Sequence, residues 1–489
     1  ASSMTFIDGT VVNVALPALQ AGLQATMTDV QWVIEAYALF LGALILVGGS
    51  LGDQYGRKRV FLIGVVVFTA ASALCGAAAS PRVLIAGRAV QGIGAALLVP
   101  GSLAIISATF DDERRGAAIG TWSGFSAITT AIGPVAGGWL IEHVSWRAVF
   151  FLNVPFAIAV VALSWRYVPE SRDPGRTSRI DWVGAGLAVG GLGGIVLGLL
   201  EWPSRGTGDP LVVAASAIGV VALALLPLVE RRSSRAMMPT GLFRSQPFTV
   251  ANILTLLLYA ALTLVMFLVP MNLIQVQHYS ATAAGAALLP LPVIIFALSR
   301  WSGGLVRRVG SRLPLTIGPA IGAVGIALCT RPGVGGSYWT TFFPAFVLIG
   351  AGMAIAVAPL TTTVMASIAR EHAGVASGVN NAVSRVAGLL AIAVFGVVLS
   401  RTFQARADSG LDTLHLSASE RTAIERELPK MAGAELPTGE AQVRVVVYEA
   451  FVAAFRVVMW CGAALALGSA ACGAAIRAAG GVNRRHASD

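Results

Sequence analysis

The chain is dominated by a succession of apolar runs, each about 20 residues long and separated by short polar segments. A helix of about 20 apolar residues can cross the hydrocarbon core of a bilayer. Only 12% of the residues are charged, whereas a soluble domain carries about 25%. The sequence therefore predicts an all-α integral membrane protein. We place fourteen transmembrane helices at 1–23, 30–52, 59–78, 83–108, 115–138, 147–167, 181–201, 211–230, 247–276, 281–305, 313–330, 339–368, 373–401 and 446–477.

The distribution of basic residues predicts the orientation. If the N-terminus is cytoplasmic, twenty Arg and Lys residues fall in the inside loops and tail, against four in the short outside loops: Arg82, Arg147, Arg205 and Arg331. Cytoplasmic loops of membrane proteins carry this excess. Both ends are therefore expected in the cytoplasm, and the net charge of +10 needs no nucleic-acid partner. The four cysteines lie in apolar runs without metal-ligand spacing, so we expect packing roles for them.

Two Pro/Arg-rich linkers divide the chain. We expect an N-terminal six-helix bundle over 1–168, linkers with two inserted helices over 169–246, a C-terminal six-helix bundle over 247–477 and a cytoplasmic tail over 478–489. The inserted pair has no ionisable group at mid-membrane and is interpreted as structural. A long outside loop, about 402–446, contains SASERTAIEREL, which could form a polar surface helix.

An internal repeat supports two related halves. GSLGDQYGRK follows the second span and GGLVRRVGSR follows the tenth, with glycines at equal offsets. Parallel six-helix halves around an axis along the membrane normal are typical of one large class of transporters. The sequence thus favours a transporter built from two such halves.

The first copy, GSLGDQYGRKR, resembles the loop signature of the major facilitator superfamily. Its glycines permit a tight reversal, and Asp53 can meet the positive start of the next helix. The resemblance implies that this loop latches one of two alternating conformations. The second copy carries Arg307 in place of the acid, so we expect an asymmetric latch. The predicted conformational residues of this loop are Gly49, Asp53, Gly56, Arg57 and Lys58.

Two further spans resemble motifs of the same superfamily. Span four contains Arg88 and Gln91 in an Arg-x-x-Gln-Gly-x-Gly pattern. A buried arginine needs a carboxylate, a carbonyl or water, so Arg88 either takes part in proton coupling or clamps backbone carbonyls. Span five contains GFSAITTAIGPVAGG, similar to the motif associated with antiporters, and its expected hinge or seal residues are Gly133, Pro134, Gly137 and Gly138. Ordinary small-residue packing is the alternative for span five.

Three stretches resemble the fourteen-span drug:proton antiporter family of this superfamily. They are FIDGTVVNVALP with Asp8 and Asn13, QWVIEAY with Trp32 and Glu35, and NNAVSRVAGLLAIAVFG with Asn380, Asn381 and Arg385. The second stretch is similar to that of quaternary-ammonium exporters. The resemblance implies the major facilitator fold and a multidrug efflux function.

The two acids are expected at different depths. At about 1.5 Å per residue, Asp8 lies roughly 22 Å below the outer end of its span and Glu35 only about 8 Å below the end of its own. They are therefore not expected to touch. Asp8 suits a deep proton site, whereas Glu35 suits attraction of a cation or a second proton site. A solvated helix-end acid is the alternative for Glu35.

Span nine carries a polar and aromatic stripe at three- and four-residue steps. We expect it to face a central cavity for varied apolar cations, with interhelical hydrogen bonding as the alternative. Its members are Asn252, Thr255, Tyr259, Thr263 and Met266. The remaining predicted cavity residues are Asn13, Trp32, Gln91, Asn380, Asn381 and Arg385, and the predicted proton-coupling residues are Asp8, Glu35 and Arg88.

The predicted function is proton-coupled antiport that exports amphipathic, cationic drugs or toxic compounds by alternating access. Export of a lipid, a siderophore or a self-made antibiotic is the alternative within transport. A membrane enzyme or sensor is the alternative of another class, but no nucleotide loop, metal cluster or nucleophile with a base is found. The expected partners are a small substrate, protons and membrane lipids, without a cofactor or metal. We expect a monomer in a bacterial plasma membrane.

Overall fold

A computed structural model describes residues 2–110, 112–172, 181–232, 240–303, 305–368, 373–414, 416–436 and 441–476, and these ranges contain helices but no strand. The predicted linkers lie partly outside the described residues, and the predicted tail 478–489 lies wholly outside them. The N-terminal helices are α1 (Ser2–Leu23), α2 (Met27–Tyr55), α3 (Arg57–Gly76), α4 (Pro81–Thr109), α5 (Asp112–His143), α6 (Ala148–Phe151) and α7 (Asn153–Tyr167). They are followed by α8 (Trp182–Arg205), α9 (Pro210–Arg232) and the short 3-10 helix η1 (Thr240–Arg244).

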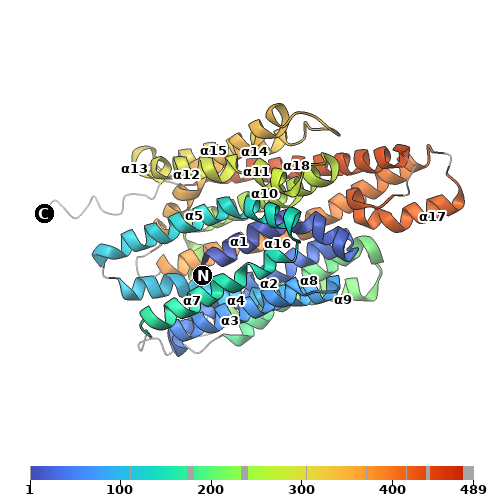
Figure 1. Cartoon of the computed structure of the whole chain (residues 1–489). Helices are drawn as coiled ribbons and strands as arrows, with labels where there is room; N and C mark the ends of the chain where they lie inside the picture. The colour runs from blue at the N-terminus through green and yellow to red at the C-terminus, as the bar shows by residue number, and fades with distance from the viewer. Residues whose placement is uncertain are drawn as a thin grey trace.

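The C-terminal helices begin after η1. They are α10 (Gln246–Met271), η2 (Asn272–Val276), α11 (Ala281–Ala287), α12 (Pro290–Gly303), α13 (Leu305–Val309), α14 (Arg312–Leu328), α15 (Tyr338–Ala366), α16 (Ala373–Leu411), α17 (Ala418–Glu427), η4 (Leu428–Gly433) and α18 (Ala441–Ala475). Figure 1 shows most of the long helices running along one common direction, with α17 beyond one end of the bundle.

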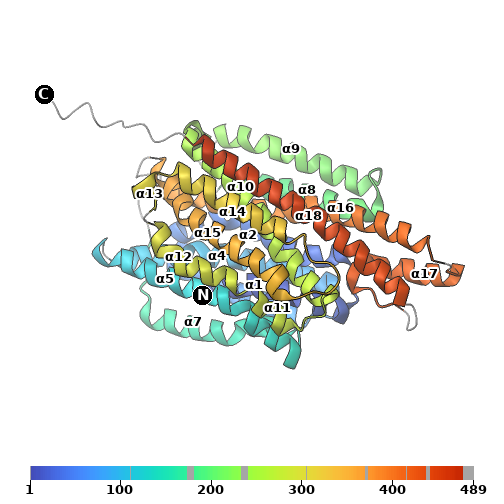
Figure 2. The same ribbon diagram turned by 90° about the horizontal axis from the view of Figure 1, so that it is seen from above.

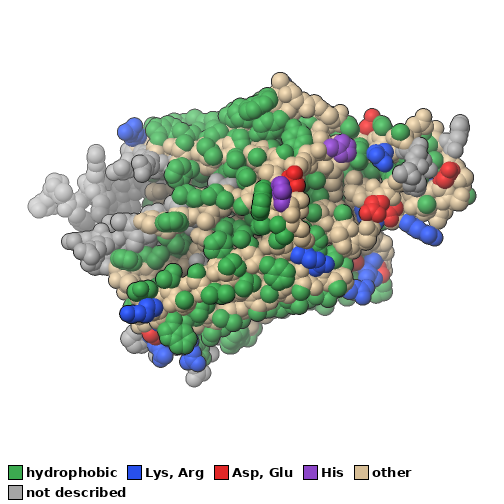
Figure 3. Space-filling view, viewed as in Figure 1, with side chains coloured by type: hydrophobic (Ala, Val, Ile, Leu, Met, Phe, Trp, Pro, Cys, Tyr) green, Lys and Arg blue, Asp and Glu red, His purple; other side chains and the backbone are tan. Residues whose placement is uncertain are grey.

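The described part of the chain contains twelve helices long and apolar enough to cross a membrane. The helix α14 is a shorter apolar helix, and α5, with 32 residues, is not among the twelve. The count of fourteen spans stays a prediction. Large apolar side chains such as Ile158 and Trp165 are exposed on the outside of the bundle, and charged side chains gather mainly toward its ends (Figure 3). The surface therefore suits a protein surrounded by lipid.

Each half is held together by packing among its own helices. In the first half, α4 packs against α2 and α3, and α1 packs against α5; in the second, α14 packs against α15 and α18, and α10 against α16 and α18. The inserted helices α8 and α9 pack against each other along one flank of the bundle (Figure 2). The helix α8 also contacts α2 of the first half and α16 of the second.

Several helix ends have local causes in the sequence. Thr26 and Asp29 form a capping box at the start of α2, and Ser417 and Glu420 form another at the start of α17. The predicted polar surface helix SASERTAIEREL is therefore present as α17. The predicted span 281–305 is broken between α11 and α12, where Pro290 begins the second helix.

The boundaries of the long loop differ from those expected. The helix α16 continues ten residues beyond the predicted end of its span, to Leu411, and α18 starts at Ala441. The loop is shorter because both helices extend past the apolar stretches on which the prediction was based. An apolar run indicates the part of a helix that lies in the membrane, and it does not show how far the helix continues into water.

Candidate functional site

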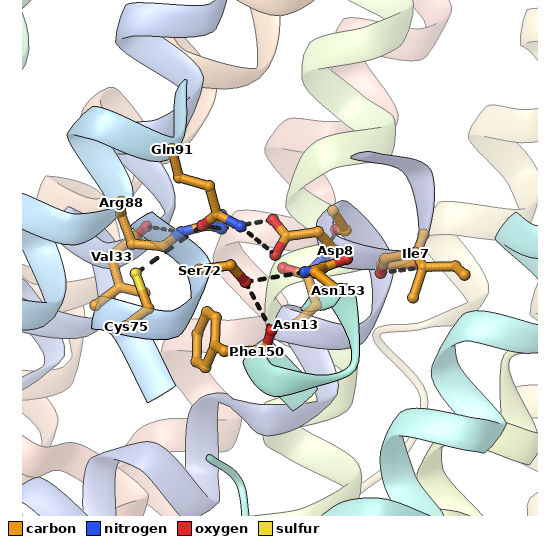
Figure 4. Close-up of polar contacts among 12 residues, drawn as sticks. Ile7, Asp8, Asn13, Val33, Ser72, Cys75, Arg88, Gln91, Phe150 and Asn153 are labelled. Atoms are coloured by element: carbon orange, nitrogen blue, oxygen red, sulfur yellow. Dashed lines mark hydrogen bonds and ion pairs between the residues drawn. The ribbon is translucent and has the colours of Figure 1, made fainter. Parts of the chain in front are cut away.

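A buried ion pair links α1 and α4 near the middle of the first half. Arg88 Nη1 lies 2.5 Å from Asp8 Oδ2, and the Gln91 amide donates to Asp8 Oδ1 at 2.8 Å (Figure 4). Arg88 Nη1 also donates to Gln91 Oε1 at 2.7 Å. Asp8 is 1% exposed and Arg88 2% exposed. Both oxygens of the carboxylate are thus satisfied, and its charge is compensated.

The remaining contacts of Arg88 fix the guanidinium in place. Its Nε donates to the Val33 carbonyl of α2 at 3.0 Å, and its carbon Cζ lies 4.2 Å from the centre of the Tyr37 ring. The sequence left two roles open for Arg88, proton coupling or a clamp on backbone carbonyls. In the structure Arg88 contacts both a carboxylate, that of Asp8, and a backbone carbonyl, that of Val33. The pairing of Arg88 with Asp8 was not predicted.

Glu35 has a different environment. It is fully buried, and neither carboxylate oxygen has a hydrogen-bond partner among the described residues. The solvated helix-end alternative is therefore wrong, because the turn that carries Glu35 is enclosed by neighbouring helices. Trp32, one turn earlier, packs against an apolar cluster that includes Leu192 and Val196 of α8, and its indole donates to Glu201 at 3.4 Å. The structure thus places Trp32 against the inserted pair and not in a shared site with Asp8.

The stripe on α10 faces α16. The Asn380 amide donates to Thr255 Oγ1 at 2.7 Å and to Asn252 Oδ1 at 3.2 Å, and both acceptors are buried. Asn252 and Thr255 make the interhelical hydrogen bonds of the alternative, because Asn380 of a neighbouring helix supplies their partner, and their place in a cavity stays a prediction.

The other members of the stripe are less enclosed. Tyr259 and Met266 are partly buried against the main core, and the Thr263 hydroxyl donates to the Tyr259 carbonyl at 2.8 Å. Asn13 and Asn381 donate to carbonyls of their own helices, at 3.1 Å and 3.0 Å, so neither reaches across to another helix.

Arg385 lies where α16 passes between α2 and α10. A Cβ atom added at Gly42 of α2 would be 3.2 Å from Arg385 Cβ, and one at Gly388 of α16 would be 3.0 Å from Thr263 of α10. The charge of Arg385 interacts electrostatically with Tyr37 and Tyr259. Within the described part of the chain, its guanidinium has no hydrogen bond or ion pair.

The motif loop between α2 and α3 forms a tight reversal. Gly56 has a φ of 109°, which favours glycine, and Arg57 pairs with Asp53 at 2.8 Å. The carboxylate at the start of α3 is Glu170, which accepts from the backbone amides of Lys58 and Arg59 at 3.1 and 3.2 Å. Asp53 was expected in this place, but it lies in the last turn of α2 and reaches Arg57 four residues on. The Lys58 ammonium donates to the Trp165 carbonyl at 3.1 Å.

The glycines of this loop and of its repeat differ in what they contribute. A Cβ atom at Gly49 would lie 3.7 Å from Pro100, an ordinary contact, so Gly49 is not required for close packing. In the second copy, Gly310 has a φ of 75°, which matches the left-handed backbone of Gly56. The side chain of Arg307 lies outside the described residues.

The glycines of α5 form a close contact with α1 and α11. A Cβ atom at Gly133 would be 2.3 Å from Thr10 Oγ1, one at Gly137 would be 2.3 Å from Val11, and one at Gly138 would be 2.4 Å from the Ala281 carbonyl. The helix continues through Pro134 to His143. The motif thus joins the first half to α11 of the second, as a seal would require.

The structure shows no metal centre in its described part, where no three His, Cys, Asp or Glu side chains gather in a group that could hold an ion. The sequence did not predict two contacts between distant residues. Glu170 carried no motif signal, and the pairing of Asp8 with Arg88 joins residues 80 positions apart.

The chain is similar in sequence to a known family and to several of its members. The sequence profile of the Major Facilitator Superfamily matches residues 1–392. The Tetracenomycin C resistance and export protein of Streptomyces glaucescens is 32% identical over 476 residues, covering 96% of this chain and 88% of that protein. The Multidrug resistance protein Stp of Mycobacterium tuberculosis is 33% identical over 410 residues, covering 84% of this chain and 76% of that protein.

Solved structures support the fold. An inward-facing, unoccupied bacterial homolog of the human lysosomal transporter Spinster superposes with a TM-score of 0.64 at 16% identity, covering 97% of this chain and 96% of that one. At this identity the likeness concerns the fold alone.

Proposed function

Because the chain belongs to the major facilitator superfamily, we propose that it is a proton-coupled antiporter that exports amphipathic drugs by alternating access. Its relatives include drug- and antibiotic-resistance exporters, which supports drug export. The observation that carries proton coupling is the buried network of Asp8, Arg88 and Gln91. An intramembrane acid that pairs with an arginine is typical of proton pathways.

Protonation of Asp8 can change the contacts between α1 and α4. When Asp8 is ionised, it holds Arg88 and Gln91 of α4 against α1. A proton on Asp8 removes the charge that Arg88 compensates, so the guanidinium retains only carbonyl and amide partners. The contact between α1 and α4 weakens in that state, which biases the two halves toward the other conformation.

Glu35 provides a second proton site in this scheme. Its carboxylate is enclosed without a hydrogen-bond partner in the described residues, so the neutral form is favoured in this conformation. Exposure of Glu35 in the other conformation would let it lose the proton or bind a cation. The expected preference for cationic compounds rests on this acid.

The proposal also covers the oligomeric state, the membrane and the orientation of the protein. We place it as a monomer in a bacterial plasma membrane with both ends in the cytoplasm, driven by the proton gradient and without a cofactor. Export of an antibiotic made by the cell itself is the second candidate, because a relative is named as a Tetracenomycin C export protein.

Transport by proteoliposomes tests the coupling. An imposed pH gradient should drive drug accumulation against its gradient, and Asp8→Asn should abolish this drive while exchange of drug at equilibrium continues. The matched control is Asp408→Asn, which neutralises an exposed acid near the end of α16. Gradient-driven export that survives Asp8→Asn would remove Asp8 from the coupling.

A further inference from the structure

Arg385 is partly buried in the helix bundle and has no hydrogen bond or ion pair to any described residue. Arg385 is twelve residues after the start of α16 at Ala373, about 18 Å along the helix axis. An arginine side chain cannot reach a membrane surface over that distance, so its charge is not carried into the headgroup region. The guanidinium therefore needs a partner inside the protein or from a bound molecule.

The neighbouring acids do not supply this partner. Asp8 is occupied by Arg88 and Gln91, and Glu35 makes no hydrogen bond to any described residue. The positions of Gly42 beside Arg385 and of Gln31 beside Gly396 set the register of the antiparallel helices α2 and α16. Glu35 lies seven residues before Gly42, so it is about 10 Å from the level of Arg385 along this seam.

The surroundings of Arg385 can receive a molecule. The side chain of Asn381, one turn before it, is exposed although α16 packs against α2, α8, α10, α15 and α18. The exposed side chain of Asn381 thus marks accessible space one turn from Arg385, and Tyr37 and Tyr259 lie within electrostatic range of the guanidinium.

We propose that Arg385 binds an anionic oxygen of the exported compound, so that acidic amphiphiles are substrates. Arginine remains charged in proteins, and its planar donors fit a carboxylate, sulfonate or phenolate. A charge that is partly enclosed among helices without a counter-charge is unfavourable, and an anionic ligand removes that cost. The two tyrosines offer ring surface and hydroxyl donors to the aromatic part of such a molecule. The inference rests on the proposed export function and adds compounds with an acidic group to the cationic compounds expected from Glu35.

Two fluorescent probes that differ by one charged group test this inference. They are 8-anilinonaphthalene-1-sulfonate and its neutral analogue N-phenyl-1-naphthylamine, titrated into the purified protein in lipid nanodiscs, with empty nanodiscs subtracted. Arg385→Gln should weaken binding of the sulfonate about tenfold or more and change binding of the neutral probe less than about twofold. Arg385→Lys, which keeps the charge, should lose less. Arg406→Gln, an exposed arginine farther along α16, should change neither.

The inference is overturned if Arg385→Gln leaves sulfonate binding unchanged or weakens both probes equally. If that variant does not fold, the wild-type protein decides: a neutral probe that binds as tightly as the sulfonate overturns the inference. Transport of the neutral probe separates the two proposals. Proton-driven export of this probe by Arg385→Gln supports the export function whatever the sulfonate does, whereas sulfonate binding that depends on Arg385 supports the inference even without proton-driven export.

Discussion

At the residue scale, the buried ion pair of Asp8 and Arg88 joins α1 to α4 and is the proposed site of proton coupling. Its members are almost completely enclosed, and Gln91 completes the hydrogen bonds of the carboxylate. Removal of one partner from a buried pair leaves an uncompensated charge, which is more costly than removal of both. The pair therefore links the fold of the first half to the protonation of one residue.

Arg88→Met should lower stability by about 3 kcal/mol or more, because Asp8 is left buried and charged. The double variant Asp8→Asn with Arg88→Met should recover part of this loss, since both charges are then absent. Melting of the purified protein in detergent measures both effects, and Arg82→Met, an exposed arginine at the start of α4, is the control. Additive losses would show that the two residues are not coupled in the folded protein.

At the scale of elements, α5 is the point at which the two halves approach most closely through glycines. Gly133 and Gly137 face α1, and Gly138 faces α11. Small residues of this kind allow helix backbones to approach in a membrane. A larger side chain at Gly138 would separate helices of the two halves, and one at Gly133 or Gly137 would push α5 away from α1 within the first half.

Gly137→Val should reduce drug export strongly, because its side chain would occupy the space of Val11. The matched control is Gly190→Ala in α8, where an added Cβ meets nothing within 4 Å. Initial rates of export from vesicles, normalised to the amount of folded protein, measure the difference. Equal rates for the two variants would mean that the close contact of α5 with α1 is dispensable.

At the scale of the whole molecule, one end of the bundle is held closed by contacts between the halves. The Thr282 hydroxyl of α11 donates to the Glu142 carboxylate of α5 at 2.5 Å, and Gln20 of α1 donates to the Lys430 carbonyl of η4 at 3.1 Å. The Lys430 ammonium bonds to Gln24 of α1. In the expected topology this is the outer end, so these contacts would close the protein toward the outside.

Closure should depend on the external pH through Glu142, which lies beyond the predicted span 115–138. Hydrogen bonds, chiefly from Thr282, hold the pKa of Glu142 below its usual value in the closed state. In the open state, without these hydrogen bonds, the pKa of Glu142 should return to the ordinary value of a carboxylic acid. The stabilisation is thus fully present at a pH above that value and is lost as the pH falls toward the lower, closed-state pKa.

Spin labels at the exposed positions 144 and 340 should report this opening as a longer distance at acid pH. Glu142→Gln should shift the balance toward the open form at neutral pH and reduce its dependence on acid. Asp408→Asn, away from the contact between α5 and α11, serves as the control. An unchanged distance distribution in Glu142→Gln at every pH would exclude this contact from closure.

The sequence predicted local features well where one segment determines them. The polar helix α17 follows from its own capping box, and Gly56 and Gly310 share a left-handed backbone because each reversal is encoded by its own turn. The pairing of Asp8 with Arg88 depends on which helices become neighbours, and periodicity does not specify that. The same limit applies to Asn252 and Thr255, whose partner Asn380 comes from another helix. Glu170 follows the last helix of the first half, and only the fold brings it to α3.

The position of α8 decides where lipid can reach the seam between the halves. This helix lies against α2 and α16 at once, with α9 behind it (Figure 2). A hydrophobic compound dissolved in the bilayer therefore meets a double wall on this flank. At the other crossing between the halves, α5 lies against α11 and α12, and the close approach of Gly138 to the Ala281 carbonyl makes this flank a single tight seam.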